Sequence, residues 1–310
     1  MKILDESLIK NTISMEEAID VLRENYRSYS SSSDNNPART IVRVQEKHAT
    51  FGVMPYYSHA HNLFMVKIVS HHLLNKAYGR PSIGGVIVIQ DGATGQIKAQ
   101  MDAAAITALR TGATAGLATD LLAMAHSKKV AVIGAGAQAM AVFEAVLSVR
   151  KVKQVAVCST SQASTERFIA EAKNRFVREI EYISHHSVRQ AVSGADIICT
   201  ATTCAAPLFS ACDVAKGAHI NAIGKHTLVS REFPLELLHR AILMVEDRKA
   251  AIEEAGDYHQ NSISIAQMLN SQYAVHQRET TIFSSVGTAF QDACICIAIL
   301  KKLKVVSGGS

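Results

Sequence analysis

The chain has 310 residues, which is enough for two domains or one large one. Hydrophobic residues make up 48% and charged residues 19%, a balance that supports a buried core and excludes an intrinsically disordered chain. The net charge is only +5 and no dense run of Lys or Arg occurs, so nucleic acid is not expected as a partner. A mild positive charge suits small anionic ligands instead, such as a nucleotide cofactor or a carboxylate.

No segment of the sequence resembles a targeting signal or a membrane span. Residues 1–17 carry charges throughout and have no apolar core, so we expect no signal peptide. No apolar run reaches the length needed to cross a membrane, and Ser307–Ser310 resembles a linker. The six cysteines form no C-x-x-C motif and have no His at zinc spacing, so most of them are expected to be buried thiols. A reduced, cytoplasmic protein is therefore expected.

The part of the chain before residue 102 is expected to be rich in strands. A short strand is expected at Ile3-Leu4 and a helix over 14–29, because Ser14 and Glu17 have the spacing of a capping box. The polar, Ser-rich residues 28–37 predict a loop. Further strands, with Asp91-Gly92 as a hairpin turn signal, are expected at 40–44, 50–54, 64–70 and 85–91.

Later in the chain the pattern becomes that of an α/β fold. A helix is expected over 102–125, and after Lys129 strands and helices alternate. The expected strands are short apolar runs at 130–133, 155–158, 197–200, 218–223 and 242–245. This alternation is typical of a doubly wound parallel sheet. The last helix, over 289–303, is apolar on most sides and is expected to pack against the first domain.

The most specific motif follows the apolar strand at 130–133. That strand runs into the turn Gly134-Ala135-Gly136 and then into an Ala-rich helical pattern. Gly134 permits the tight turn, Gly136 lets a phosphate approach the backbone, and the third small position is Ala139. A second strand at 154–158 completes a βαβ unit that binds the pyrophosphate of a dinucleotide. The alternative is an Ala- and Gly-rich helix start in another kind of α/β protein.

The end of the second strand bears on the choice between NAD and NADP. NAD-binding folds place an Asp or Glu in this region to bind the ribose 2′-hydroxyl. Here no acid occurs between Glu144 and Glu166, and Ser159, Thr160 and Ser161 follow the strand instead. Their hydroxyl groups could bind a 2′-phosphate, which favours NADP(H) over NAD(H). Alternatively, these residues form a surface turn with no part in selectivity.

Three cationic residues are candidates for the chemistry. Lys67 lies inside the apolar strand run 63–69, and burial pushes the pKa of a lysine toward neutrality. Such a lysine suits a proton donor or a group that polarises a carbonyl or an imine. The alternative is a lysine on an edge strand that reaches solvent. Arg39 and Arg110 could clamp a carboxylate with paired hydrogen bonds, although each by itself could equally be a solvated surface residue.

The histidines give weaker signals. His59-x-His61 could present two imidazoles on one face of a strand, but no third ligand follows at a recognisable spacing, so we expect no metal site. His226 follows the apolar run 220–223, at the end of a strand where ligands bind in such sheets. It could act there as an acid or a base, or it could be an ordinary loop histidine.

Taken together, the motifs resemble the ornithine cyclodeaminase/mu-crystallin family over nearly the whole chain. The matching segments occur in the family's order: Pro37-Ala38-Arg39, Val53-Met54-Pro55, Lys67, 84–99, 106–113, 134–139, 194–203, 220–226, Glu232 and 283–292. The resemblance implies a strand-rich α+β domain for substrate binding and dimerisation, formed by 1–125 and 288–310. It also implies a Rossmann dinucleotide-binding domain over 126–287 and a homodimer that binds NAD or NADP.

The resemblance also implies roles for individual residues. Lys67 matches the active-site lysine, Arg39 and Arg110 match the pair that binds the substrate carboxylate, and Met54 lines the pocket. The positions that match cofactor contacts are Thr111, Gly134, Gly136, Ala137, Gln138, Ala139, Thr202, Ile223, Val286 and Gly287.

One departure from the family pattern affects the expected reaction. Cyclodeaminases carry an aspartate, the acid/base group for ammonia loss, at the position that His226 occupies here. A basic residue expected to contact the cofactor is replaced by Ser230. The family also contains ketimine and imine reductases and alanine dehydrogenases, which need only a hydride and a proton donor.

The sequence therefore predicts an NAD(P)H-dependent oxidoreductase that reduces a C=N bond next to a carboxylate, as a ketimine or imine reductase or as an amino-acid dehydrogenase. In this hypothesis Lys67 is catalytic and His226 assists it. Two alternatives remain open at this point. One is an ornithine- or lysine-type cyclodeaminase that uses NAD⁺ without net redox change, and the other is a non-catalytic NADP(H)-binding protein of the crystallin type.

Overall fold

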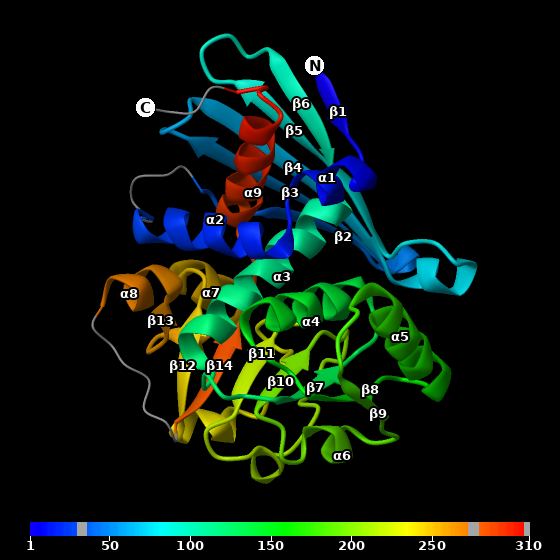
Figure 1. Cartoon of the computed structure of the whole chain (residues 1–310). Helices are drawn as coiled ribbons and strands as arrows, with labels where there is room; N and C mark the ends of the chain where they lie inside the picture. Colours follow the sequence, from blue (N-terminus) through cyan, green and yellow to red (C-terminus); the bar gives the residue numbers. More distant parts are fainter. Residues whose placement is uncertain (30–35, 272–278, 307–310) are drawn as a thin grey trace. The chain divides into compact units, whose positions relative to one another are not determined.

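A computed structural model describes residues 1–29, 36–271 and 279–306 and divides the chain into two units (Figure 1). Unit 1 comprises Met1–Arg110 and Thr288–Ser310, and unit 2 comprises Thr111–Gly287. The division falls inside helix α3, Ala103–Leu122, whereas the domain border predicted from the sequence lies after that helix, at 125/126. Part of the predicted loop 28–37, and the linker-like Ser307–Ser310, lie outside the described residues.

Unit 1 is built on a six-stranded sheet in the order β1-β6-β5-β4-β3-β2. Neighbouring strands from β2 to β6 are antiparallel, while β1 joins β6 in parallel. Their bounds are β1 Lys2–Leu4, β2 Thr40–Val44, β3 Ala49–Ser58, β4 Leu63–His72, β5 Ile83–Asp91 and β6 Ile97–Asp102, with 3-10 turns η1 Gln45–Lys47 and η2 Leu73–Tyr78. The hairpin arrangement predicted from the turn signals is confirmed, although β3 and β4 are longer than expected and β6 was not predicted.

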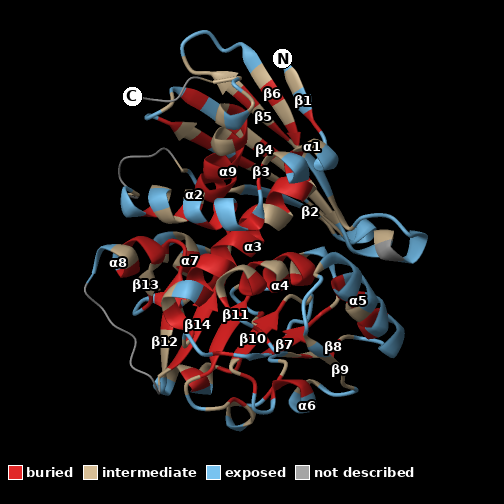
Figure 2. Cartoon of the chain, viewed as in Figure 1, coloured by how far each residue is buried: buried red, intermediate tan, exposed pale blue. Residues whose placement is uncertain are grey.

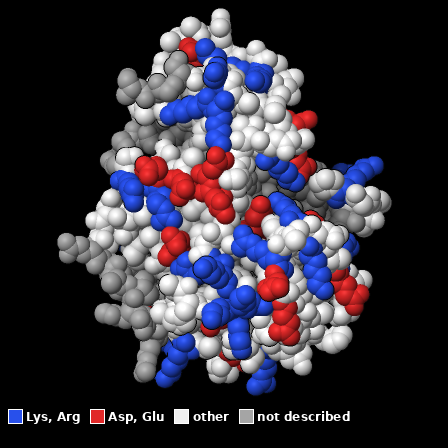
Figure 3. Space-filling view, viewed as in Figure 1, with Lys and Arg blue, Asp and Glu red and all other residues white. Residues whose placement is uncertain are grey.

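Helices α1 (Glu6–Thr12), α2 (Met15–Arg27) and α9 (Ala289–Lys302) complete unit 1. The predicted capping box of α2 is present: the Ser14 side chain accepts from the Glu17 N–H, and the Glu17 carboxylate accepts from the Ser14 N–H. The buried face of α2 packs against α9, which in turn packs against β3. The exposed face of α2 carries acidic side chains that gather on the surface in Figure 3: Glu16, Glu17, Asp20 and Glu24.

Unit 2 contains an eight-stranded parallel sheet in the order β13-β12-β14-β11-β10-β7-β8-β9. Its strands are β7 Lys129–Ile133, β8 Gln154–Cys158, β9 Glu181–Ser184, β10 Ile197–Thr200, β11 His219–Ala222, β12 Ala241–Val245, β13 Ile263–Ser264 and β14 Thr280–Ser284. From β7 the chain proceeds outward to β8 and β9, and it then crosses back to β10 and proceeds the other way. The strand order thus reverses beside β7, which is the ligand-binding position in doubly wound sheets. The predicted α/β fold class is confirmed.

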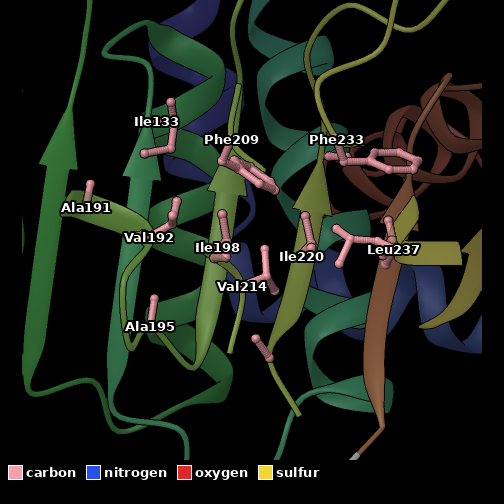
Figure 4. Packing of buried hydrophobic residues seen from close by; sticks show 14 of the residues in the cluster. Ile133, Ala191, Val192, Ala195, Ile198, Phe209, Val214, Ile220, Phe233 and Leu237 are labelled. Atoms are coloured by element: carbon pink, nitrogen blue, oxygen red, sulfur yellow. The ribbon is translucent and has the colours of Figure 1, made fainter. Parts of the chain in front are cut away.

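Short helices cover the sheet of unit 2. They are α4 Ala137–Val149, α5 Gln162–Arg175, α6 Val188–Val192, α7 Arg248–Ala255, α8 Ile265–Asn270 and the 3-10 turns η3 Ala211–Asp213, η4 Leu235–His239 and η5 Asp257–His259. On one face, Ile133, Ile198 and Ile220 from adjacent strands pack under Phe209 and Phe233 from the connecting segments (Figure 4). Strands β10, β11 and β14 are buried along their whole length (Figure 2), as is expected for the central strands of a parallel sheet that is covered on both faces.

Helix α3 is largely buried, and an arginine from a later segment of the chain caps its C-terminal end. The Arg150 guanidinium donates to the carbonyl oxygens of Thr119, Ala123 and Met124, so one buried cation satisfies the last turn of the helix. Among the residues that the structure describes, no helix combines the length and the apolar character needed to cross a membrane.

Candidate active site

Lys67 lies in the middle of unit 1, on an interior strand. Strand β4 is paired on both sides, and Lys67 stands opposite Met54 on β3 and Ile87 on β5. The side chain is only 3% exposed. The alternative of an edge-strand lysine that reaches solvent is therefore wrong, and the prediction of a buried lysine is confirmed.

Asp292 is the partner that this buried cation requires. Its Oδ2 lies 2.7 Å from Lys67 Nζ, and its Oδ1 lies 3.2 Å from Arg110 Nε. Asp292 is fully buried in the first turn of α9, whereas Arg110 lies on α3. Lys67 Nζ also donates to Thr107 Oγ1 at 3.2 Å. Three segments far apart in the sequence therefore converge on one carboxylate.

A further contact joins α3 to α9 beside this carboxylate. Arg110 Nη1 donates to Gln291 Oε1 at 3.3 Å, and the same oxygen accepts from the Thr288 N–H at 2.9 Å. Gln291 thus caps the start of α9 and holds Arg110 at the same time. Arg110 is fixed in position by two neighbouring residues of one helix.

The surroundings of Lys67 set its protonation. The pKa of Lys67 is lowered from its usual value to about 8. Burial is the main cause, the carboxylate of Asp292 opposes it, and the charges of Arg110 and Arg39 add to the lowering. Arg39, which is half-buried just before β2, is therefore close enough to act on this lysine. With such a pKa, Lys67 is mostly protonated at pH 7 and gives up a proton readily, which is the property of a general acid.

In unit 2, the glycine turn after β7 has the geometry of a phosphate cradle. Gly134 has φ of +110°, and a Cβ on it would lie 2.7 Å from the carbonyl oxygen of Ala201, so only glycine is tolerated there. Gly136 is the N-cap of α4, and a Cβ on it would meet no protein atom within 4 Å. The space in front of Gly136 is thus open to a ligand.

The first turn of α4 also suits an anion. The cap residue Gly136 has no side chain to offer the N–H groups of that turn, which therefore point toward the open space. Ala139 is buried against the sheet, as its place in the motif requires. The Oε1 atom of Gln138 is buried without a hydrogen-bond partner among the described residues. These features fit the pyrophosphate of a dinucleotide, with Ala137 and Gln138 beside it.

At the end of β8, hydroxyl groups stand where many such folds carry an acid. The Ser161 side chain caps α5, and Ser164 Oγ donates to Ser159 Oγ at 3.1 Å. Thr160 between them is exposed. The N-terminus of a 14-residue helix and a group of hydroxyls therefore meet at this strand end.

Two buried glutamates organise the loops on the other side of β7. Glu232 accepts hydrogen bonds from Thr202, after β10, and from the N–H of Gly224, which follows Ile223 after β11. Glu246 accepts from the N–H groups of Val286 and Gly287, after β14. No role was predicted for either glutamate, although Glu232 is one of the positions that match the family. Glu246 directly follows a buried apolar run, where ligand-binding residues occur in such sheets.

His226 is also at this edge of unit 2 and is buried. Burial lowers the pKa of its imidazole to about 4, so the ring is neutral at pH 7. Its ring lies tilted against Phe233, with 5.7 Å between centroids, and neither nitrogen has a hydrogen-bond partner of normal geometry in the described part of the chain. A neutral imidazole with so low a pKa is a poor proton donor, so His226 differs sharply from Lys67.

The other histidines do not form the arrangement considered from the sequence. His59 and His61 lie in the turn between β3 and β4 rather than on one face of a strand. In residues 1–29, 36–271 and 279–306, no group of three His, Cys, Asp or Glu side chains has the arrangement of a metal site.

The sequence pattern of the ornithine cyclodeaminase/mu-crystallin family matches residues 2–305. The chain belongs to this family. Over 260 residues it is 32% identical to ketimine reductase mu-crystallin of Mus musculus, an alignment that covers 83% of this chain and 81% of the relative.

Solved structures of family members have the same fold. Thermococcus litoralis Δ1-pyrroline-2-carboxylate reductase, in complex with NADH and L-proline, gives a TM-score of 0.92 at 29% identity and covers 98% of both chains. An archaeal alanine dehydrogenase dimer with bound NAD gives a TM-score of 0.87 at 26% identity, covering 100% of this chain and 98% of the other.

The resemblance predicted from the sequence is therefore confirmed. Asp292 is the main residue that sequence reasoning left without a role. It lies inside 283–292, one of the segments that match the family. An acidic residue in an otherwise apolar helix could have indicated a buried carboxylate with a specific partner.

Proposed function

We infer that this chain is an NAD(P)H-dependent oxidoreductase that reduces a C=N bond next to a carboxylate. The observation that carries this conclusion is Lys67, a buried lysine whose pKa is lowered to about 8 and whose ammonium is held by Asp292. The relatives support it, because the mouse relative is named a ketimine reductase and the Thermococcus relative a pyrroline-2-carboxylate reductase.

The residues of unit 1 account for substrate binding and proton transfer. We propose that Arg39 and Arg110 bind the substrate carboxylate and that Met54, opposite Lys67, lines the same pocket. Lys67 protonates the imine nitrogen, which makes the carbon more electrophilic, and it is then left as a neutral amine. Asp292 keeps Lys67 charged before this step and orients its Nζ.

The residues of unit 2 account for the cofactor. We propose that Gly134, Gly136, Ala137, Gln138 and Ala139 hold its pyrophosphate. Further contacts come from Thr111, Thr202, Ile223, Val286 and Gly287. Reduced nicotinamide, when bound, supplies the hydride for the substrate carbon. NADP(H) is proposed over NAD(H), because Ser159 and Thr160 replace the usual acid and lie at the N-terminal end of α5.

A small cyclic imine with one carboxylate is the proposed substrate, by analogy with the proline-bound relative. His226 supports a reductase over a cyclodeaminase. The family's cyclodeaminases are expected to carry a carboxylate at this position, whereas the buried imidazole of His226 has a pKa of about 4 and carries no charge at pH 7. We propose that His226 assists as an uncharged hydrogen-bonding group.

The chain is proposed to act as a homodimer in the cytoplasm. On the sheet of unit 1, Val42, Phe51 and Phe64 are between 42% and 53% exposed on the face opposite Lys67. An apolar face of this kind suits an interface between two copies, and the archaeal relative is a dimer. Six free cysteines suit a reducing compartment. Sedimentation should give twice the mass of one chain, and Phe51→Asp should shift it toward the monomer.

The reaction itself can be tested by following the absorbance of the reduced nicotinamide. The protein is mixed with NADPH, or separately with NADH, and with Δ1-pyrroline-2-carboxylate and a panel of other cyclic imines. We expect oxidation of the cofactor together with formation of the cyclic amino acid, faster with NADPH. Release of ammonia from ornithine in the presence of NAD⁺, without net cofactor oxidation, would contradict this proposal and favour a cyclodeaminase.

A further inference from the structure

Glu232 is a buried anion that ties two strand ends together. It is fully buried, and its carboxylate accepts four hydrogen bonds, two from Thr202 (N–H and Oγ1), one from Thr200 Oγ1 and one from the Gly224 N–H. The distances range from 2.6 Å to 2.7 Å. A Cβ on Gly224 would lie 2.3 Å from Glu232 Oε1, so the glycine lets the carboxylate reach the backbone.

Glu246 repeats this arrangement two strands away. It directly follows β12 and is fully buried. Its Oε1 accepts from Ser285 Oγ and from the Gly287 N–H at 3.2 Å, and its Oε2 accepts from the Val286 N–H at 3.2 Å. The loop that follows β14 is therefore built around this carboxylate.

The hydrogen bonds of both side chains suit the carboxylate form. In each carboxylate, both oxygens accept from a backbone N–H, and an ionised group satisfies such donors best. Burial raises the pKa of Glu232 above its usual value, and the hydrogen bonds from Thr202, Thr200 and Gly224 offset part of that rise. Within the described residues, no Lys, Arg or His side chain forms an ion pair with either glutamate. Hydrogen-bond dipoles alone therefore stabilise both carboxylates. Burying a charge without an ion-pair partner costs folding free energy, and proteins accept such costs mainly at functional sites.

Topology assigns both glutamates to one half of the cofactor site. The pyrophosphate cradle follows β7, and the ribose-binding end of β8 lies on one side of it. Glu232 joins the ends of β10 and β11, and Glu246 organises the ends of β12 and β14, all on the other side. In a doubly wound sheet that binds a dinucleotide across the switch point, this other half receives the nicotinamide.

We propose that Glu232 and Glu246 bias the cofactor site toward the oxidised cofactor, whose nicotinamide ring is a cation, and against the uncharged reduced ring. This inference rests on the proposed function. During reduction, the C4–H bond of the dihydronicotinamide breaks, its electron pair forms the new C–H bond at the imine carbon, and the ring becomes positively charged. The imine nitrogen takes its proton from Lys67. Fixed negative charges near the ring favour this change, because they need no reorganisation as the charge develops.

Binding measurements test the proposal without relying on turnover. Dissociation constants of NADP⁺ and NADPH are measured by calorimetry for the wild type, Glu232→Gln and Glu246→Gln. We expect the constant for NADP⁺ to rise about fivefold more than the constant for NADPH in each variant, since only the oxidised ring loses a charge–charge attraction. Each substitution is nearly isosteric, and thermal melts of both variants establish that they are folded. The two sites are independent, so one folded variant decides the question.

Two controls separate charge from general damage. Glu236→Gln and Glu253→Gln remove the same charge from exposed positions of the same unit, where water screens it, and should leave both constants unchanged. 2′-Phospho-ADP-ribose, which lacks the nicotinamide ring, should bind the wild type and all variants with the same dissociation constant. Equal weakening of NADP⁺ and NADPH, or no weakening, would overturn the inference. If neither cofactor bound the wild type, the proposed function itself would fail.

Discussion

Buried charge is balanced in different ways in the two units. In unit 1, Lys67 and Arg110 lie against the carboxylate of Asp292, so cations and an anion neutralise one another. In unit 2, Glu232 and Glu246 are held by backbone N–H and hydroxyl groups, with no cation paired to them among the described residues. The pKa of Lys67 results from large opposing effects and is easily moved, which suits a residue that transfers a proton. Carboxylates fixed by the backbone suit a rigid binding frame.

Removing the Lys67 amine of unit 1 should have the largest effect, because it should lower the rate of the reaction without changing cofactor binding. Lys67→Met should lower kcat by about 100-fold or more, because the variant has no general acid for the imine nitrogen. The dissociation constant of NADPH should not change, because the cofactor cradle lies in unit 2. Stopped-flow turnover and calorimetry measure the two quantities. Lys98→Met, at a partly exposed lysine of strand β6 in the same sheet, should keep the wild-type rate. Full activity of Lys67→Met would remove the role assigned to this residue.

Removing the Asp292 carboxylate of unit 1 should shift the pH profile of kcat/KM to lower pH. Lys67 must be protonated to act, so wild-type kcat/KM should fall as pH rises through about 8. In Asp292→Asn the attraction that raises the pKa of Lys67 is lost, while burial and the two arginines still lower it. The alkaline decline should therefore begin at a lower pH, with about a 10-fold lower rate at pH 8. A profile of unchanged shape with a uniformly lower rate would mean that Asp292 has only a structural part.

The glycine turn offers a matched test within unit 2. Gly134→Ala should destabilise the fold by about 2 kcal/mol, because alanine is strained at a φ of +110° and its Cβ would press on the carbonyl of Ala201. Gly136→Ala meets no protein atom, so its cost should stay at about 1 kcal/mol, from the helix cap alone. Gly136→Ala should nevertheless raise the dissociation constant of NADPH about 10-fold, because its methyl group would occupy the space that the cofactor phosphates need. Denaturant titration and calorimetry compare the two, and unweakened NADPH binding by Gly136→Ala would exclude this cradle.

A smaller effect is expected for cofactor selectivity. Ser159→Asp places a carboxylate where NAD-binding folds carry one, and it should repel the 2′-phosphate. The ratio of kcat/KM for NADPH to that for NADH should fall about fivefold. Ser193→Asp makes the same change at an exposed serine of unit 2 and should leave the ratio alone. If Ser159→Asp leaves it unchanged, the end of β8 does not select the cofactor.

Local patterns predicted much of the fold. The capping box of Ser14 and Glu17 located α2, and the apolar runs located five strands of the parallel sheet, because both signals act over a few residues. Helix α1 was missed because it has only seven residues, too few to show a helical repeat, although Asp5 caps it. Strand β14 was missed because its two threonines interrupt the apolar run, and both are buried only after the sheet assembles.

For the candidate site, the sequence by itself determined which groups are available and where the backbone must bend. Lys67 within an apolar run and the glycines of the turn after β7 could be read directly, since an apolar strand and a positive φ are local requirements. Only the tertiary structure decided what these groups meet. Asp292 is 225 residues from Lys67 along the chain, and they form an ion pair because α9 returns to the sheet of unit 1. The lowered pKa of Lys67 arises from burial and neighbouring charge, and neither exists until the chain has folded around it.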